Sequence, residues 1–123
     1  MLTLLALACG PKHATGGPSS AQLAGTTWTM DSSLDDAPIQ HYQVVLAGEG
    51  LLEVHNERDT TQGNDHWQVQ AGVLTLTMND AYVTYTGRFV SPDRVEGSAQ
   101  NVRGETWRFA LCRGTDCQLE DSP

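Results

Sequence analysis

The sequence predicts an all-β protein whose fold is an eight-stranded antiparallel up-and-down barrel. Apolar and polar residues alternate with a period of two along most of the chain, as expected for strands with one buried face. Turn residues interrupt this alternation about every eight to twelve positions, a spacing typical of small sandwiches and barrels. No apolar pattern with the helical period persists for about ten residues, the span that would favour helix over strand. A two-sheet sandwich of the same strands is the alternative that the sequence leaves open.

Eight segments carry the alternation, and short turns separate them. In chain order they are residues 26–31, 39–47, 51–58, 66–70, 73–78, 82–90, 94–100 and 105–112. Links of this length favour pairing in chain order, and closure into a barrel removes the exposed sheet edges that promote aggregation. The piece at 31–38 has room for one helical turn. Gly87 and Gly97 fall in neighbouring segments, where the absence of a side chain permits a sharp bend.

Length and charge restrict the function. The 123 residues suffice for one domain, and the formal net charge is -8. Such a balance repels phosphate backbones and anionic lipid head groups, and no basic cluster compensates for it. We therefore expect no nucleic-acid partner, and we expect any membrane contact to come from a covalent lipid.

An apolar stretch at residues 2–8 opens the chain, and it is far too short to cross a bilayer as a helix, which takes about 20 residues. It is typical of the end of a signal peptide. The sequence Ala6-Leu7-Ala8-Cys9-Gly10 resembles a bacterial lipobox, although Ala6 stands where Leu is usual. We therefore expect a lipid such as palmitate on Cys9, followed by a flexible tether rich in Gly, Pro and Ser. An ordinary apolar N-terminus with a buried Cys9 is the alternative.

Three cysteines are an odd number for an exported protein. If a lipid occupies Cys9, Cys112 and Cys117 remain as a pair, and Gly114 between them allows a tight reversal. A disulfide implies an oxidising compartment, so we expect the bacterial cell envelope, with the anchor on the periplasmic side of the outer membrane. The expected organisation is a signal remnant at 1–8, a lipidated Cys and linker at 9–23, a barrel domain at 24–117 and an acidic tail at 118–123.

The segment Leu23-Ala24-Gly25-Thr26-Thr27-Trp28 resembles the Gly-x-Trp motif in the first strand of lipocalins and related calycins, with one extra residue between Gly and Trp. The resemblance implies a lipocalin-like barrel of avidin size, in which the Trp packs across the barrel floor against a basic residue of the last strand. Arg108 is the candidate for that barrel-floor partner, and Arg113 just beyond it is the alternative. A guanidinium over an indole face adds cation–π attraction.

Six aromatic side chains are expected to point into the barrel. They are Trp28, Tyr42, Trp67, Tyr85, Phe89 and Trp107. An eight-stranded barrel has room only for side chains or for one small ligand, so these residues either fill the interior or line a cavity. Aromatic walls with a few polar tips suit a small apolar or amphipathic molecule. The six are therefore candidate ligand-binding residues.

The polar residues predict neither a metal site nor a catalytic centre. Glu53, His55, Glu57 and His66 are of types that bind metals, but the alternation places all four on the solvent face. The acidic residues at 31–36 lack the Gly and the terminal Glu of a calcium loop, and we expect an ordinary acidic turn there. No Ser or Cys combines with a His base and an orienting acid. We therefore expect no metal, no cofactor and no enzymatic activity.

Two functions follow from these expectations. The first is a membrane-anchored, monomeric barrel that binds a small hydrophobic ligand at the end opposite Trp28. The second is an exported protein-interaction barrel that inhibits a protease or a lysozyme, docking through the polar loop 56–65 or the segment 16–24. Its negative charge would steer it toward a cationic partner. A purely structural envelope protein is a third possibility.

Overall fold

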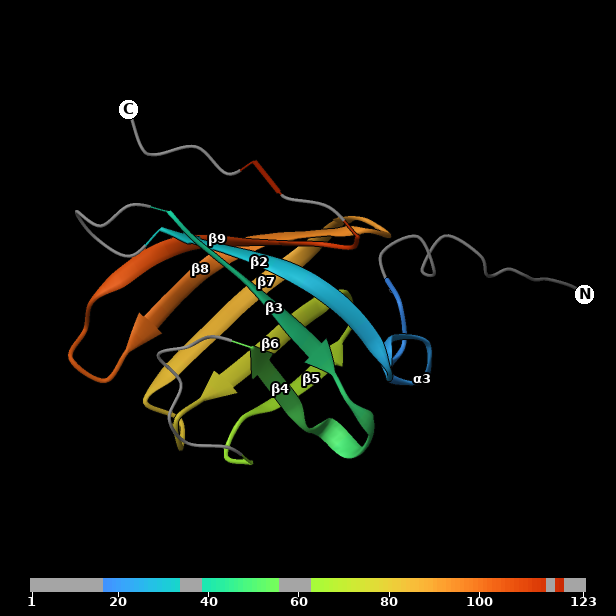
Figure 1. The fold of residues 1–123 in the computed structure, drawn as a ribbon, viewed down its shortest axis with the longest axis horizontal. Coiled ribbons are helices and arrows are strands. Elements are labelled where there is room, and N and C mark those ends of the chain that lie inside the picture. Colours follow the sequence, from blue (N-terminus) through green and yellow to red (C-terminus); the bar gives the residue numbers. More distant parts are fainter. Residues whose placement is uncertain (1–16, 34–38, 56–62, 115–116, 119–123) are drawn as a thin grey trace, which may run out of the picture.

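A computed structural model of the chain describes residues 17–33, 39–55, 63–114 and 117–118. Within them, one antiparallel sheet curls into a nearly closed barrel (Figure 1). The elements in chain order are α3 (Ser20–Leu23), β2 (Thr26–Ser33), β3 (Gln40–Leu46), the 3-10 turn η1 (Gly48–Gly50), β4 (Leu52–His55), β5 (His66–Gln70), β6 (Val73–Met78), β7 (Val83–Ser91), β8 (Arg94–Asn101) and β9 (Thr106–Cys112). Cys9 and the expected signal segment lie outside the described residues.

The barrel is an up-and-down meander, as the sequence predicts. From β2 to β4 and from β5 to β9, each strand pairs with the next, and β9 returns to pair with β2, where Met30 faces Leu111. The seam lies between β4 and β5. There Leu51 and His66 form an isolated bridge, and the N–H of Leu52 donates to the carbonyl oxygen of Asp65 over 3.0 Å. The all-β prediction is confirmed, and the pairing of β2 with β9 replaces the two-sheet alternative by one curled sheet.

The core consists of the inward-facing side chains of the strands, and the predicted alternation locates them correctly. In β6, for example, Leu74, Leu76 and Met78 are buried, while the residues between them are half-buried. The largest fully buried apolar side chains are Trp28, Phe109, Leu23, Met30, Leu46, Leu74, Leu76, Leu111, Val44 and Val95. Removal of this apolar surface from water is the main driving force for the fold.

Gly87 and Gly97 lie opposite each other in β7 and β8. A methyl group on Gly97 would collide with the carbonyl oxygen of Thr86, and one on Gly87 would lie 2.9 Å from the ring of Phe109. Glycine is therefore required here because the backbones and the Phe109 ring approach closely. These are the two glycines that the sequence singled out.

The folded part of the chain begins earlier than residue 24, the predicted start of the domain. The Oγ of Ser19 accepts from the N–H of Gln22 over 3.2 Å, and the side chain of Gln22 accepts from the N–H of Ser19 over 2.8 Å. This reciprocal capping box fixes the first turn of α3. The helix directs Leu23 into the barrel, where its side chain is fully buried. Residues 19–23, which the sequence analysis assigned to a flexible tether, therefore belong to the folded domain.

The predicted strand segments match the observed strands to within two residues at each end that the structure describes. Segments 66–70 and 73–78 coincide with β5 and β6 residue for residue. The third segment, 51–58, corresponds to β4 over Leu52–His55, and its remaining residues 56–58 lie outside the described residues. The helical turn considered for 31–38 is contradicted at its start, because β2 continues to Ser33. Within the described ranges, no helix is long and apolar enough to cross a membrane.

Candidate functional site

One end of the barrel is closed around Trp28. The indole N–H of Trp28 donates to the Oγ1 of Thr26 over 2.8 Å, and the ring meets Phe89 edge to face at 6.1 Å between centroids. The guanidinium of Arg113 lies 4.7 Å from the centroid of the Trp28 ring. The hydroxyl of Thr26 in turn donates to the carbonyl oxygen of Leu23 over 2.6 Å, and the Leu23 side chain is fully buried, so packed side chains plug this end. We call it the Trp28 end.

The cation over Trp28 belongs to Arg113 and not to Arg108, so the first choice for the barrel-floor partner is corrected. β9 alternates with Trp107 and Phe109 inside, which places Arg108 on the exposed outer face. Arg108 also pairs in register with Ser33, at the other end of β2. Because β9 runs toward the Trp28 end, the residue that follows its last position reaches the indole.

A surface groove of about 530 Å³ lies against the Trp28 end. Its lining includes Pro18, Phe89, Val90, Pro92, Asp93 and Arg113. The Nε of Arg113 lies 3.6 Å from the carboxylate of Asp93, and the backbone N–H of Arg113 donates to the carbonyl oxygen of Asp93 over 3.0 Å. The volume falls in the range of small-molecule sites, but the cation of the groove is already engaged by Asp93 and Trp28.

The opposite end of the barrel has a different chemistry. The hydroxyls of Tyr42 and Tyr85 lie 3.3 Å apart and share a hydrogen bond in which either can donate. Tyr85 meets Trp107 edge to face at 6.1 Å, and the indole N–H of Trp107 donates to the Oγ of Ser32 over 2.9 Å. Two hydrogen-bonded pairs, Tyr42 with Tyr85 and Trp107 with Ser32, are thus linked by the ring contact between Tyr85 and Trp107. We call this the tyrosine end.

The six candidate ligand-binding aromatics therefore separate into three groups. Tyr42, Tyr85 and Trp107 come together at the tyrosine end, and Tyr85 also contacts the ring of Phe109 at 5.1 Å. Trp28 and Phe89 form the plug. The indole N–H of Trp67 donates to the carbonyl oxygen of Ala47 over 2.7 Å, which fastens β5 to the chain ahead of η1 at the seam. Only the first group combines aromatic walls with several polar tips.

Two hairpins at the tyrosine end expose apolar side chains that sequence reasoning missed. Tyr82 is 39% exposed and Val102 is 68% exposed, and they line a hollow of about 160 Å³. Asn79, Asp80 and Ala81, which precede Tyr82, all have positive φ, a region that residues other than glycine seldom adopt. The carboxylate of Asp65 accepts from the N–H of Asn79 over 2.7 Å and holds the start of this turn. Tyr82 and Val102 each lie in a turn between two strands. An apolar residue in a turn gives no periodic signal, so the sequence did not reveal that these two side chains form an exposed apolar pair.

Of the polar residues considered as metal ligands, three lie on the outer face of the barrel and the fourth lies outside the described residues. Glu53, His55 and His66 are exposed, as the alternation predicts, and Glu57 lies outside the described residues. The expected acidic turn is contradicted at Asp31, which lies within β2 and is fully buried, with a carboxylate oxygen 2.8 Å from the Nδ1 of His41. Asp35 and Asp36 lie outside the described residues.

The predicted disulfide between Cys112 and Cys117 is present. No family model, curated protein or solved structure matches the chain. The class of the protein is therefore defined by its fold: it is a small all-β protein with an eight-stranded, nearly closed antiparallel barrel, consistent with the lipocalin-like architecture.

Proposed function

We propose that this protein is a lipid-anchored barrel of the bacterial cell envelope that binds one small apolar or amphipathic molecule at its tyrosine end. The observation that carries the proposal is the contrast between the two ends. The Trp28 end is plugged by Leu23, Trp28 and Arg113, whereas the tyrosine end gathers hydroxyl groups over aromatic rings.

The chemistry of the tyrosine end fits a ligand with a small polar head. Binding pockets combine apolar and aromatic walls with a few placed polar groups that fix orientation. Here the hydroxyls of Tyr42 and Tyr85 would hydrogen-bond the head group, while Trp107 would contact the apolar part. The interior below is filled by buried side chains, so the ligand is small and occupies the mouth.

The proposed anchor lies on the other side of the barrel. Lipidation of Cys9 would leave a tether of about ten residues before Ser19, which spans roughly 17 Å as a flexible chain. Because α3 sits at the Trp28 end, this end would face the membrane and the tyrosine end would face away from it. The disulfide agrees with an oxidising compartment such as the periplasm.

The ligand proposal is tested by titrating the purified full-length protein with a neutral, fluorescent naphthylamine dye and measuring the affinity of the dye. We expect saturable binding that weakens by about tenfold in Tyr42→Phe/Tyr85→Phe, since a lost hydrogen-bonding pair contributes about that much. Tyr82→Phe removes a tyrosine hydroxyl from an exposed position outside the barrel and is the control. No dye binding, or equal loss in the control, would contradict the proposal. Mass spectrometry of the Cys9 peptide from native membranes tests the anchor separately.

Inhibition of an envelope or secreted enzyme is the second candidate, and the exposed hairpins favour it. Tyr82 and Val102 stand at the tyrosine end as apolar anchors, and the net charge of -8 would accelerate encounter with a cationic enzyme such as a lysozyme. Most of the predicted docking loop, 56–62, lies outside the described residues. If this function holds, Tyr82→Ala should abolish inhibition of a responsive lysozyme, and added salt should slow association. Absence of inhibition across a panel of proteases and lysozymes would exclude it.

A further inference from the structure

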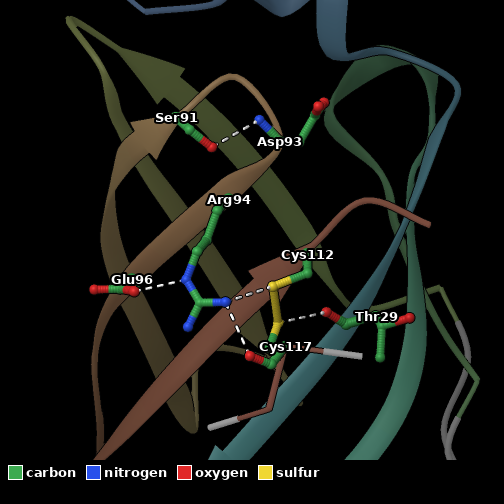
Figure 2. A network of polar contacts seen from close by, with 7 residues as sticks. All are labelled: Thr29, Ser91, Asp93, Arg94, Glu96, Cys112 and Cys117. Atoms are coloured by element: carbon green, nitrogen blue, oxygen red, sulfur yellow. Dashed lines mark hydrogen bonds and ion pairs between the residues drawn. A yellow bond between two sulfur atoms is a disulfide. The ribbon is translucent and has the colours of Figure 1, made fainter. Parts of the chain in front are cut away.

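The two sulfurs of the Cys112–Cys117 disulfide lie in different structural settings (Figure 2). Cys112 is the last residue of β9 and pairs with Thr29 of β2 on one side and with Arg94 of β8 on the other. Cys117 belongs to no strand and packs with Ala110 and Cys112 on the outside of the sheet. Cys112 is thus fixed within the sheet, and Cys117 is fastened to it.

A cation lies beside only one of the two sulfurs in this network. The Nη1 of Arg94 donates to the Sγ of Cys112 over 3.2 Å and to the carbonyl oxygen of Cys117 over 2.9 Å. The Nε of the same guanidinium donates to the carboxylate of Glu96 over 2.6 Å, which holds it in place. A nearby guanidinium stabilises a thiolate, so Arg94 favours negative charge on the sulfur of Cys112.

The other sulfur faces an acceptor. The Sγ of Cys117 lies 3.6 Å from the carbonyl oxygen of Thr29. When the disulfide is reduced, a carbonyl at this position accepts a hydrogen bond from a protonated thiol and disfavours a thiolate. The cation beside Cys112 and the carbonyl oxygen beside Cys117 therefore both favour the thiolate on Cys112 over the thiolate on Cys117.

We propose that Cys112–Cys117 is a polarised disulfide that an external dithiol of the cell envelope attacks at Cys117, with Cys112 as the leaving sulfur. Thiol–disulfide exchange is faster when the leaving thiolate is better stabilised, and it also depends on which sulfur can be reached. Both sulfurs are buried, with 6% and 4% of the residues exposed, so attack requires a local opening. Lifting Cys117 disrupts no strand pairing, whereas exposing Cys112 would open the β2–β9–β8 ladder.

Reduction of the protein disulfide takes two successive thiol–disulfide exchanges. A thiolate of the dithiol forms a bond to the Sγ of Cys117 while the bond between the two protein sulfurs breaks, and its electron pair stays on Cys112 beside Arg94. The second thiol of the dithiol loses its proton to solvent and attacks the dithiol sulfur bound to Cys117, which releases the Cys117 thiolate to take up a proton. The dithiol becomes a disulfide, and the protein disulfide gains two electrons.

Reduction would release Cys117 from the outer face of β2 and β9. In the oxidised protein this residue covers part of the face that carries Thr29 and Ala110. The sheet itself keeps its pairing, because Cys112 remains in β9. Reduction of this disulfide would therefore change one outer face of the barrel and leave the tyrosine end untouched.

The attacked sulfur can be identified by peptide mapping. The oxidised full-length protein is treated briefly with reduced glutathione, then quenched with excess N-ethylmaleimide, which alkylates the free thiols, and digested with trypsin. Cleavage after Arg108 and Arg113 separates Cys112 in peptide 109–113 from Cys117 in peptide 114–123. We expect glutathione on Cys117 and maleimide on Cys112 in at least about a fivefold excess over the reverse pattern. Equal labelling, or glutathione mainly on Cys112, would overturn the proposal.

Variants at Arg94 test the cause of the preference. Arg94→Gln should bring the labelling ratio close to even, and Arg94→Lys, which keeps the charge, should retain most of it. Arg103→Gln removes an arginine charge from an exposed loop at the far end of β8, keeps both tryptic sites, and should not change the ratio. A looser tail in Arg94→Gln would alter the reduction rate but not the partition between sulfurs. An unchanged partition in that variant contradicts the role of Arg94, and the wild-type map decides the attacked sulfur even if the variant does not fold.

Discussion

The two ends of the barrel contain the same kinds of residue and use them differently. At the Trp28 end, the indole is stacked under Arg113, contacts Phe89 and donates to Thr26, so its polar and apolar surfaces all have partners within the fold. At the tyrosine end, Trp107 and Tyr85 also pack against each other, but Tyr85 shares a hydroxyl hydrogen bond with Tyr42, and the Trp107 indole donates to the hydroxyl of Ser32.

Under the proposed function, this difference assigns stability to one end of the barrel and ligand binding to the other. A plug of apolar and aromatic side chains at one end removes a large area from water and fixes the strand register. The tyrosine end can then contain buried polar groups, because a few hydrogen bonds are enough to pair its hydroxyls and its indole N–H. We therefore expect truncation of the apolar plug at the Trp28 end to affect mainly stability, and loss of the Tyr42 and Tyr85 hydroxyls at the tyrosine end to affect mainly binding.

The largest expected effect is at the Trp28 end. Leu23→Ala removes a fully buried side chain beneath the barrel and should lower the free energy of unfolding by about 3 kcal/mol. Chemical denaturation followed by Trp fluorescence measures the change. Leu51→Ala, at a residue that is 45% exposed, is the control and should cost less than about 1 kcal/mol. Equal losses in both variants would mean that α3 is not part of the cooperative fold.

The next effect is at the tyrosine end and concerns a buried hydrogen bond. Ser32→Ala leaves the indole N–H of Trp107 without its acceptor and should cost about 1.5 kcal/mol. In Ser32→Ala/Trp107→Phe both polar partners are gone, so a double-mutant cycle should show a coupling of at least about 0.5 kcal/mol. Additive losses would indicate that the indole N–H has another acceptor.

A smaller effect is expected from the cation at the Trp28 end. Arg113→Gln should reduce the free energy of unfolding by about 0.5 to 1 kcal/mol, because the cation–π contact lies partly in solvent. Arg103→Gln removes the same charge from an exposed loop and should stay within about 0.5 kcal/mol of the wild type. Thermal melts under identical conditions compare the two. Arg108→Gln offers a second comparison, since a loss confined to Arg108 would reverse the assignment of the floor cation.

The smallest expected effect on stability is that of Tyr42→Phe. The ring stays in place, and the lost hydroxyl contact of 3.3 Å is long, so we expect a change below about 0.5 kcal/mol. Equilibrium denaturation is the measurement. A loss as large as that of Leu23→Ala would show that the hydroxyl pair is part of the structural core and would weaken the contrast between the ends.

Most of the fold could be predicted from the sequence because the barrel depends on a single repeated signal. Alternation with a period of two located the strands, and it assigned Tyr85 and Phe109 to the interior without any knowledge of their partners. The short helix α3 was missed because it has only one buried apolar residue, although Ser19 and Gln22 have the spacing of a capping box.

The details of the site were less predictable, since they depend on which strand ends meet. The resemblance to lipocalins implied a basic residue near Trp28, with Arg108 as first choice and Arg113 as alternative. The structure selects Arg113 through the direction of β9 and the parity of its side chains. The pairing of Asp31 with His41 likewise depends on the register between β2 and β3. Contacts of this kind are determined by tertiary structure and leave no local signal in the sequence.

The most direct test of the contrast is a titration of the isotope-labelled protein with octanol, a neutral amphiphile, followed by backbone amide NMR spectra. We expect saturable shifts grouped at the tyrosine end, around Tyr42, Tyr85 and Trp107, with residues beside Trp28 and Arg113 unaffected. Shifts centred on the Trp28 end, or none at any concentration below the solubility limit, would contradict the division of the barrel into a structural end and a binding end.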